Sequence, residues 1–264
     1  MKTPISNIEA INLGYYDKLY AKKNLLQLFF HPLISFDQQS KSKRNFLLFD
    51  PILKSWSKTS SHLPLVLDYG FGHGSFLLKL PRSCLVFGCD LSAEAVDSLN
   101  ALCKLLRRSM ELFTVNEFES KTANLNFDWI SCSHVLEHVP DDIETLRLIT
   151  SKLSSQGKIL VNLPINEVWE DPKHLRKYNT ESIHILFEKA GLHIESMQEC
   201  DRWTAFFLHF EMVKPLPRLV QPCLRVLRLL FAIIPLGTVD TLESIFIRKY
   251  PAQQILVLGS IKKK

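Results

Sequence analysis

Apolar residues along this chain alternate between short continuous runs and stripes with helical spacing. The runs cover residues 65–67, 84–89, 112–115, 127–132, 158–164, 192–196 and 254–259, and such runs are typical of strands buried on both faces of a sheet. Between them lie three stripes, formed by Val96, Leu99, Leu102 and Leu106, by Ile143, Leu146, Ile149 and Leu153, and by Ile183, Leu186, Phe187 and Ala190. Strands that alternate with amphipathic helices predict an α/β fold with a largely parallel sheet.

Residues with capping chemistry mark the predicted helix ends. Ser92 and Asp141 precede the first two stripes as N-caps. Gly157 and Gly191 follow the second and third stripes, where a glycine commonly ends a helix. We therefore expect the second helix to run up to Gly157.

Two flanking segments carry helical patterns outside this alternation. A first helix is expected around residues 15–17 and 25–30, and a second over 46–56, with Pro51 at its start or at a kink. The basic residues 41–44 are expected to be a link between them. These helices either cover the ligand site or pack elsewhere on the sheet.

A long connection of roughly 50 residues precedes the last strand, and such connections are usually functional. Residues 218–235 are apolar with interspersed arginines. They are interpreted either as helices that cover the substrate or as a basic amphipathic helix that contacts a membrane or a lipid-linked substrate.

Composition narrows the class of protein. The 264 residues are 46% hydrophobic, and the net charge of +5 includes the three lysines at 262–264, so nothing requires a nucleic-acid partner. Six cysteines occur without a C-x-x-C pair, which favours a reducing compartment over a disulfide framework. We find no signal-peptide pattern and no apolar run near the ~20 residues of a membrane span. A cytoplasmic protein is expected, with peripheral membrane contact through 218–235 as the alternative.

Candidate chemistry begins directly after the first apolar run. Asp68 is followed by glycines at positions 70, 72 and 74, and then by Phe76, from which we expect a helix to start. Glycines at such a corner let the backbone approach a nucleotide closely. The G-x-G-x-x-G pattern of dinucleotide sites would need a third glycine at Ser75, so that pattern fails.

A second acid follows the next apolar run. Asp90 comes about 20 residues after Asp68, the spacing expected of a ribose-binding carboxylate in a nucleotide-binding βαβ unit. A carboxylate there can accept hydrogen bonds from both ribose hydroxyls. Because Ser92 can cap the following helix, we assign Asp90 to the ligand rather than to the cap.

The stretch 127–140, FDWISCSHVLEHVP, is the second marker. With the glycine motif, Asp90 and the stretches around 158–164 and 174–191, it resembles class I S-adenosylmethionine (SAM) dependent methyltransferases. The resemblance is to the group with a V-L-E-H signature, which includes ubiquinone-type O-methyltransferases and glycan-tailoring methyltransferases. It implies a Rossmann-like, seven-stranded, mostly parallel sheet with an antiparallel last strand.

The same resemblance implies SAM as cofactor and a set of residues around it. Ligands bind at the carboxyl ends of parallel strands, where Ser133 and His134 are expected. The loop that contains Asn116 contacts the adenine in that family. The cofactor-binding candidates are Asp68, Gly70, Gly72, Gly74, Asp90, Leu91, Asn116, Ser133 and His134.

Transfer of a methyl group to a hydroxyl needs a base, because the acceptor oxygen must lose its proton. The candidates for this role are His134, His138 and His174, and His138 and His174 are preferred. Some relatives hold a divalent metal through Glu-x-x-Glu-His, but His134 stands here at the first glutamate position. His134, Glu137, His138 and His174 could form a mixed site, yet we expect no metal.

The expected organisation has four parts: an N-terminal helical cap over 1–60, a SAM-binding core over 61–202, a helical insertion over 203–250, and a last strand with a basic tail over 251–264. The expected reaction is methylation, on oxygen, of a small or lipid-linked acceptor such as a sugar or a phenolic or quinone-type compound. The alternatives are a NAD-type oxidoreductase and a SAM-binding protein that has lost catalysis.

Overall fold

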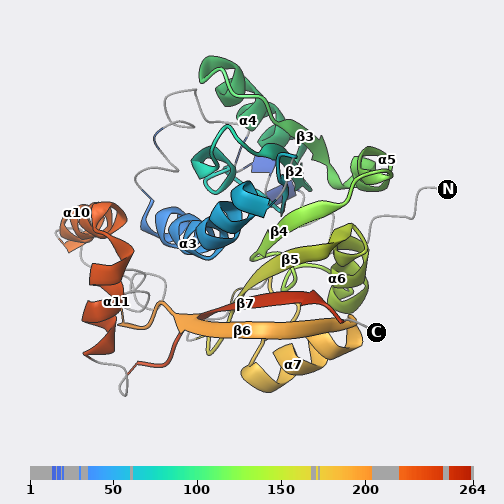
Figure 1. Ribbon diagram of the computed structural model, residues 1–264. Helices are drawn as coiled ribbons and strands as arrows, with labels where there is room; N and C mark the ends of the chain where they lie inside the picture. The colour runs from blue at the N-terminus through green and yellow to red at the C-terminus, as the bar shows by residue number, and fades with distance from the viewer. Residues whose placement is uncertain are drawn as a thin grey trace.

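Seven strands form a single sheet at the centre of the molecule (Figure 1). The computed structural model describes residues 14–15, 17–18, 20, 30, 35–59, 62–167, 171, 173–203, 220–245 and 250–262. The strands are β1 (Leu65–Tyr69), β2 (Leu85–Asp90), β3 (Glu111–Thr114), β4 (Phe127–Ser133), β5 (Leu153–Pro164), β6 (Leu192–Cys200) and β7 (Gln254–Ile261), in the order β3-β2-β1-β4-β5-β7-β6. The first five pair in parallel and β7 is antiparallel to both neighbours, which confirms the predicted fold.

Helices cover both faces of the sheet and make a three-layer sandwich. One core cluster joins α3 (Phe36–Thr59) and α4 (Ala93–Leu105) to the sheet face of Val66 and Trp129. The other joins α5 (Phe118–Thr122), α6 (Asp142–Thr150) and α7 (Thr180–Lys189) to the face of Leu67 and Ile130. Neighbouring residues on a strand point to opposite faces, so burial on both sides explains why the strands read as continuous apolar runs.

Capping hydrogen bonds occur at both of the helix starts that the sequence predicted. The Ser92 hydroxyl accepts from the Ala95 amide, and the Asp141 carboxylate accepts from the Glu144 amide. Gly191 follows α7 with a φ of +78°, the left-handed conformation that ends many helices. These three boundaries confirm what the sequence predicted.

The prediction that Gly157 ends a helix was wrong. Helix α6 stops at Thr150, and Gly157 lies inside β5. A Cβ at this position would lie 2.6 Å from the carbonyl oxygen of Phe127 on β4. The glycine is therefore required by the close approach of two strand backbones.

The helix expected from Phe76 is also much shorter than predicted. Only a three-residue 3-10 turn, η1 (Leu77–Lys79), follows the glycine motif. Leu80 is already extended, as the residue before a proline usually is, and Pro81 follows it. Consequently no long helix presents its N-terminus to a pyrophosphate here, which weighs against the dinucleotide alternative.

Helix α3 corrects two further expectations. Residues 41–44 are not a link, because they lie inside this helix, and Pro51 also lies within it on an exposed position. The Arg44 guanidinium anchors the helix, since it lies 3.3 Å from Asp201 at the end of β6 and 2.7 Å from Asp240. The Ser40 hydroxyl donates to the same Asp201 carboxylate.

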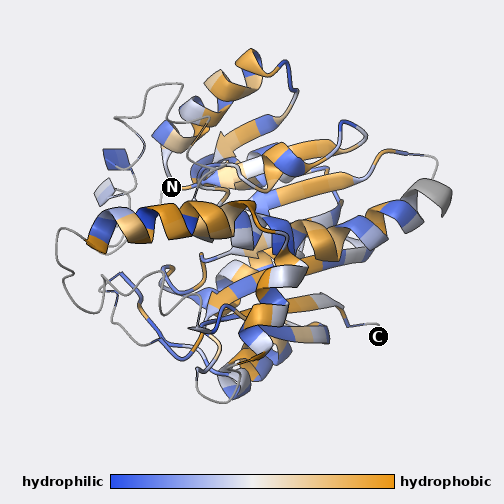
Figure 2. Cartoon of the chain, turned by 90° about the vertical axis from the view of Figure 1, so that its left-hand side faces the viewer, coloured by the Kyte–Doolittle hydropathy of each residue, from blue (hydrophilic) through white to orange (hydrophobic). Residues whose placement is uncertain are grey.

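The connection before the last strand contains α10 (Val220–Ile233) and α11 (Leu236–Ser244). Phe231 and Ala232 of α10 pack against Phe36 at the start of α3. The remainder of α10 is a mostly apolar helix on the face that Figure 2 turns toward the viewer. Among the described residues no single helix could cross a membrane, and α10 and α11 pass that test only together, bent by 115°. The helix expected around 25–30 lies, except for Phe30, outside the described residues.

Candidate active site

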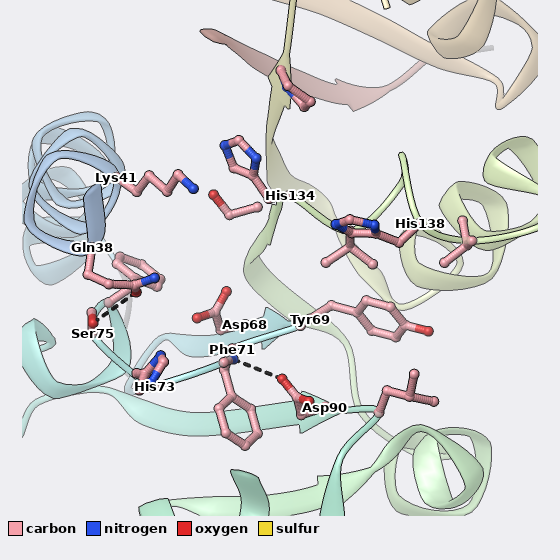
Figure 3. Close-up of a pocket in the computed structure, with 18 of the residues that line it drawn as sticks. Gln38, Lys41, Asp68, Tyr69, Phe71, His73, Ser75, Asp90, His134 and His138 are labelled. Carbon is pink, nitrogen blue, oxygen red and sulfur yellow. Dashed lines mark hydrogen bonds between the residues drawn. The ribbon is translucent and has the colours of Figure 1, made fainter. Parts of the chain in front are cut away.

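A cavity of about 680 Å³ opens at the carboxyl ends of the parallel strands. Strand β1 lies between β2 and β4 there, so the chain departs from it in opposite directions, which is the usual ligand position in such sheets. The strand ends, the loops after β4 and β5, and helix α3 line its walls. Figure 3 shows Asp68 and Asp90 on one side of this space and Lys41 on the other.

Most of the predicted cofactor-binding residues meet in this cavity. Asp68, Gly70, Gly72, Asp90, Leu91, Ser133 and His134 all line it. Gly74 does not line it. Its φ is +69°, and a Cβ there would lie 2.5 Å from Leu99 of α4, so Gly74 serves the packing of that helix. Asn116 is exposed and also lies outside the lining, whereas its neighbour Val115 is part of it.

Asp68 and Asp90 bring two buried carboxylates to the same wall, with exposed fractions of 4% and 8%. Burial raises the pKa of Asp68 to about 7; a hydrogen bond from Ser131 opposes this rise and the charge of Asp90 adds to it. Burial also raises the pKa of Asp90, although backbone amides including those of Ser92 and Gly72 donate to its carboxylate and counter the effect. A wall of this kind favours a ligand that carries positive charge and hydroxyl donors.

The loop after β4 is held by a buried polar cluster. His134 has a φ of +55°, a strained conformation for a residue with a side chain. Its Nδ1 lies 3.1 Å from Oε1 of Glu137, and its Nε2 lies 3.3 Å from Oε1 of Gln254. Burial acts to raise the pKa of the fully buried Glu137, but the contact with His134 and the charges of both neighbouring histidines outweigh it, so that pKa lies below its usual value.

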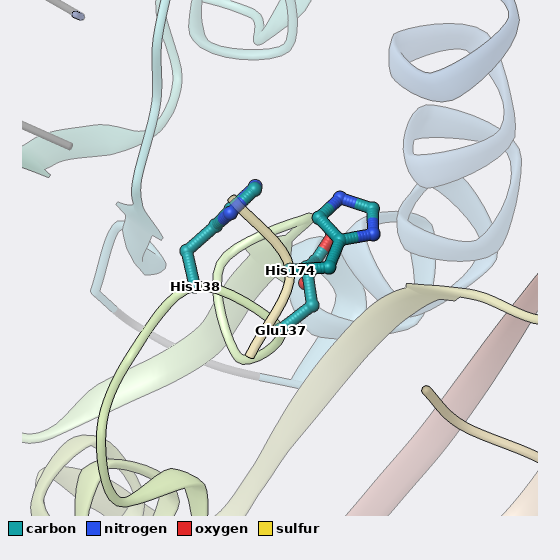
Figure 4. A group of neighbouring side chains, drawn as sticks. All are labelled: Glu137, His138 and His174. Atoms are coloured by element: carbon teal, nitrogen blue, oxygen red, sulfur yellow. The ribbon is translucent and has the colours of Figure 1, made fainter. Parts of the chain in front are cut away.

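The two predicted catalytic histidines, His138 and His174, both line the same cavity as Asp68. The rings of His138 and His174 are 4.8 Å apart between centroids (Figure 4). Nδ1 of His138 lies 3.1 Å from the carbonyl oxygen of Lys173, which fixes Nδ1 as the donor and leaves Nε2 unprotonated in the neutral ring. Burial lowers the pKa of His138, with Glu137 and the Lys173 carbonyl acting in the opposite direction.

The same loop holds a group that could bind a metal. Glu137, His138 and His174 can each offer a ligand atom, and these atoms lie within 4.8 Å of one another. Two imidazoles and one carboxylate suit a divalent transition metal better than magnesium. His134 is not part of this group among the described residues.

Sequence reasoning missed the wall that α3 contributes. Gln38, Lys41, Ser42 and Asn45 line the cavity, and their spacing places them on one side of the helix. The Ser75 hydroxyl donates to Gln38, and the Asn45 amide donates to Ser131, whose hydroxyl in turn reaches Asp68. A polar stripe at helical spacing beside an apolar one was the available signal, but it was hidden while residues 41–44 were interpreted as a link.

Comparison with known proteins gives one family match and several similar proteins. The family model described as a methyltransferase domain matches residues 40–197. The ubiquinone biosynthesis O-methyltransferase of Aeromonas salmonicida (strain A449) is 30% identical over 100 residues, a match that spans 37% of this chain and 42% of that protein. The chain therefore spans less than half of the length of this curated relative.

Two solved structures share the fold. Magnesium protoporphyrin IX methyltransferase from Synechocystis PCC 6803, with bound SAH, superposes with a TM-score of 0.54 at 13% identity and covers 96% of this chain and 100% of its own. An S-adenosylmethionine-dependent methyltransferase from Clostridium acetobutylicum ATCC 824 gives 0.51 at 12% identity, with 97% and 100% covered. At these identities the likeness concerns the fold alone.

Proposed function

This chain belongs to the methyltransferase-domain family, and we propose that it moves a methyl group from SAM to an oxygen atom of a small or lipid-linked acceptor. A sugar or a phenolic or quinone-type compound is the acceptor class that we favour. The observation that carries the proposal is the arrangement of the cavity. Two buried carboxylates, Asp68 and Asp90, and two adjacent imidazoles, His138 and His174, line the same cavity.

The residues present fit SAM, which carries an ammonium, a sulfonium and a ribose diol. Both acids line the cavity, where the Asp90 carboxylate would accept hydrogen bonds from the ribose hydroxyls and the Asp68 carboxylate would balance the positive charge of the ligand. Gly70 and Gly72, at φ of +78° and +56°, hold a backbone conformation that residues with side chains rarely adopt, and a Cβ at Gly70 would also overlap Val135. Leu91 and Val115 also line the cavity and would supply apolar contacts for the adenine.

When bound, SAM supplies a methyl carbon whose bond to sulfur breaks with the electron pair left on sulfur as the acceptor oxygen bonds to that carbon. The chain then has two tasks, alignment of the acceptor and removal of its proton. Alignment alone can lower a barrier by about 7–11 kcal/mol. His138 and His174 are the candidates to accept the proton, because both line the cavity.

Helix α10 supports the lipid-linked option. Val226, Leu230 and Ile233 are 58%, 52% and 69% exposed, and Arg225 and Arg228 lie among them with no acidic residue on the helix. Phe36, which lines the cavity, packs against Phe231 of α10. An apolar, basic surface beside the wall of the cavity suits an acceptor presented at an anionic lipid surface.

The test is an assay of SAH release from the purified protein with SAM and a panel of hydroxyl compounds. The panel contains catechols, hydroxybenzoates, short-chain polyprenyl quinols and nucleotide sugars, each beside its methoxy analogue. We expect SAH only with compounds that have a free hydroxyl, and none with the Asp90→Ala variant. Methylation found only on nitrogen or carbon would overturn the oxygen assignment, and SAM binding without turnover across the panel would favour a binding protein.

A further inference from the structure

Glu167, which the sequence analysis did not single out, lies beside one of the two histidines. Its Oε1 is 2.5 Å from Nδ1 of His174, and the two side chains are 7% and 14% exposed. Both line the cavity. We infer that Glu167 is a positioning residue that makes His174, rather than His138, the base that takes the acceptor's proton. This inference rests on the proposed function.

The backbone around His174 is fixed by contacts with the loop that follows β4. The His174 amide donates to the carbonyl of Asp171, and the Leu175 amide donates to the carbonyl of Glu137 at 2.7 Å. The Arg176 guanidinium donates to three carbonyls of that loop, at Leu136, Val139 and Pro140. The imidazole is therefore carried on a segment that is held at several points, as an oriented base requires.

Glu167 is the carboxylate left for His174 once its neighbours are assigned. Asp171 is engaged by Lys173, whose Nζ lies 3.3 Å from Oδ2 and whose amide donates to Oδ1. Glu137 lies against His134. Within the described part of the chain, Nδ1 of His174 is buried and makes no regular hydrogen bond, and the same holds for Oε2 of Glu167. The acceptor that lies against this Nδ1 is the other carboxylate oxygen of Glu167, Oε1, at 2.5 Å.

The chemistry of the two partners separates the two histidines. A carboxylate can only accept hydrogen bonds, so it holds the proton of His174 on Nδ1 and leaves the lone pair of Nε2 for the cavity. It also carries a negative charge that stabilises the imidazolium formed by proton capture. The carbonyl of Lys173 sets the same tautomer in His138 but is uncharged, and the carboxylate that acts on His138, Glu137, lies against His134.

In the proposed step the acceptor hydroxyl transfers its proton to His174 as its oxygen is methylated. The O–H bond of the acceptor breaks, its proton passes to Nε2 of His174, and its electron pair forms the new bond from oxygen to the methyl carbon. Nδ1 keeps its own proton throughout, and Glu167 remains a carboxylate. The imidazolium releases the captured proton to solvent after the product leaves.

The first measurement needs no acceptor. Protein labelled with nitrogen-15 in its histidine rings is saturated with SAH, and the tautomer of His174 is determined from its imidazole chemical shifts. We expect the Nδ1–H tautomer in the wild-type chain and a shift toward Nε2–H in Glu167→Ala. An Nε2–H tautomer in the wild-type chain would overturn the inference whatever the protein methylates.

The second measurement is turnover with the hydroxyl compound that gives SAH. We expect Glu167→Gln, which keeps the shape but removes the charge, to lower kcat at least about 10-fold with KM and SAM affinity within about threefold. Glu167→Asp should recover part of the loss. The matched control is Glu195→Gln, whose carboxylate pairs with Lys158 on the sheet, and it should leave kcat unchanged.

Two further results would overturn the assignment of His174 as the base. One is an unchanged kcat in Glu167→Gln. The other is a stoichiometric metal that survives purification and occupies Nε2 of both His138 and His174, because His174 would then have no lone pair with which to take a proton.

Discussion

Asp68 lies where burial disfavours the charged form of its carboxyl, and this burial raises its pKa. The folded-state value of about 7 exceeds the ordinary 3.8. The folded chain therefore holds this proton more tightly than the unfolded chain does. The protonation of Asp68 therefore contributes fully to the stability of the folded chain below about pH 4, and this contribution is lost as the pH rises through about 7.

Replacement of Asp68 by Asn removes that loss because an amide does not titrate. We expect the free energy of unfolding of ligand-free Asp68→Asn, relative to that of wild type, to rise by on the order of 2–4 kcal/mol from pH 4.5 to pH 8. SAM binding should weaken in the same variant. Urea unfolding at the two pH values measures the gain. Asp97→Asn, on an exposed position of α4, is the control that should show no such change. A stability difference between Asp68→Asn and wild type that is the same at pH 4.5 and pH 8 would refute the expectation.

Gly74 and Gly191 both adopt positive φ, at +69° and +78°, but only Gly74 has neighbours that a Cβ would meet. We expect Gly191→Ala to lose about 1–2 kcal/mol from backbone strain alone. Gly74→Ala should lose about 1–3 kcal/mol more because its Cβ would overlap the buried Leu99. Thermal or urea denaturation of the pair isolates the packing cost, and equal losses would show that Leu99 moves aside freely.

At the residue scale, the sequence patterns predicted the site residues that lie at the ends of strands. Asp68 and Asp90 were predictable because each follows an apolar run at a spacing that a ribose site requires. Glu167 was not predictable, because its role depends on the contact with His174 that the folded loop creates. Spacing along a chain carries no information about such a pair.

At the scale of elements, helix α3 is held against the sheet by a buried ion pair. Arg44 is 4% exposed, and its partner Asp201 is 2% exposed. Removal of one partner leaves the other charge buried and uncompensated, which typically costs about 3–5 kcal/mol. We expect Arg44→Met to lose stability of this order by urea unfolding. Lys54→Met, which removes an exposed pair with Asp50, should cost less than about 1 kcal/mol, and equal losses would contradict the anchoring role.

Helix α10 gives a prediction about lipid. We expect the protein to sediment with vesicles of anionic phospholipid at low salt and to release them as salt increases, because arginines and apolar side chains share the exposed surface. The double variant Val226→Asp and Leu230→Asp should lose this binding. Ile185→Asp, at an exposed position on α7, should retain it. Failure of the wild-type chain to bind such vesicles would remove the lipid-linked option.

Element types were predicted better than element ends. Strands buried on both faces and capped helices have local signatures, and these were correct at β1, β2 and the start of α4. The prediction at Gly157 was wrong because a glycine can either end a helix or let two strand backbones come close. Only the contact with the neighbouring strand distinguishes the two roles. Proline has a low helix propensity, yet Pro51 lies inside the 24-residue helix α3, because tertiary packing outweighs that propensity.

At the scale of the whole molecule, one cavity joins segments from residue 20 to residue 254. The sheet order explains why the motifs found in sequence, at β1, β2 and β4, become adjacent. The wall supplied by α3 came only from the structure, because its place depends on Arg44 meeting Asp201 about 150 residues later. The cofactor side of the site was therefore predictable, and the acceptor side was largely not.

Calorimetric titration of the purified chain with SAM and, separately, with NAD tests the central claim most directly. We predict one SAM site with a dissociation constant on the order of micromolar, no heat with NAD, and loss of SAM binding in Asp90→Ala. Asp97→Ala should bind SAM as the wild type does, and circular dichroism should show both variants folded. A folded wild-type chain that binds no SAM, or that binds NAD in this cavity, would contradict the account.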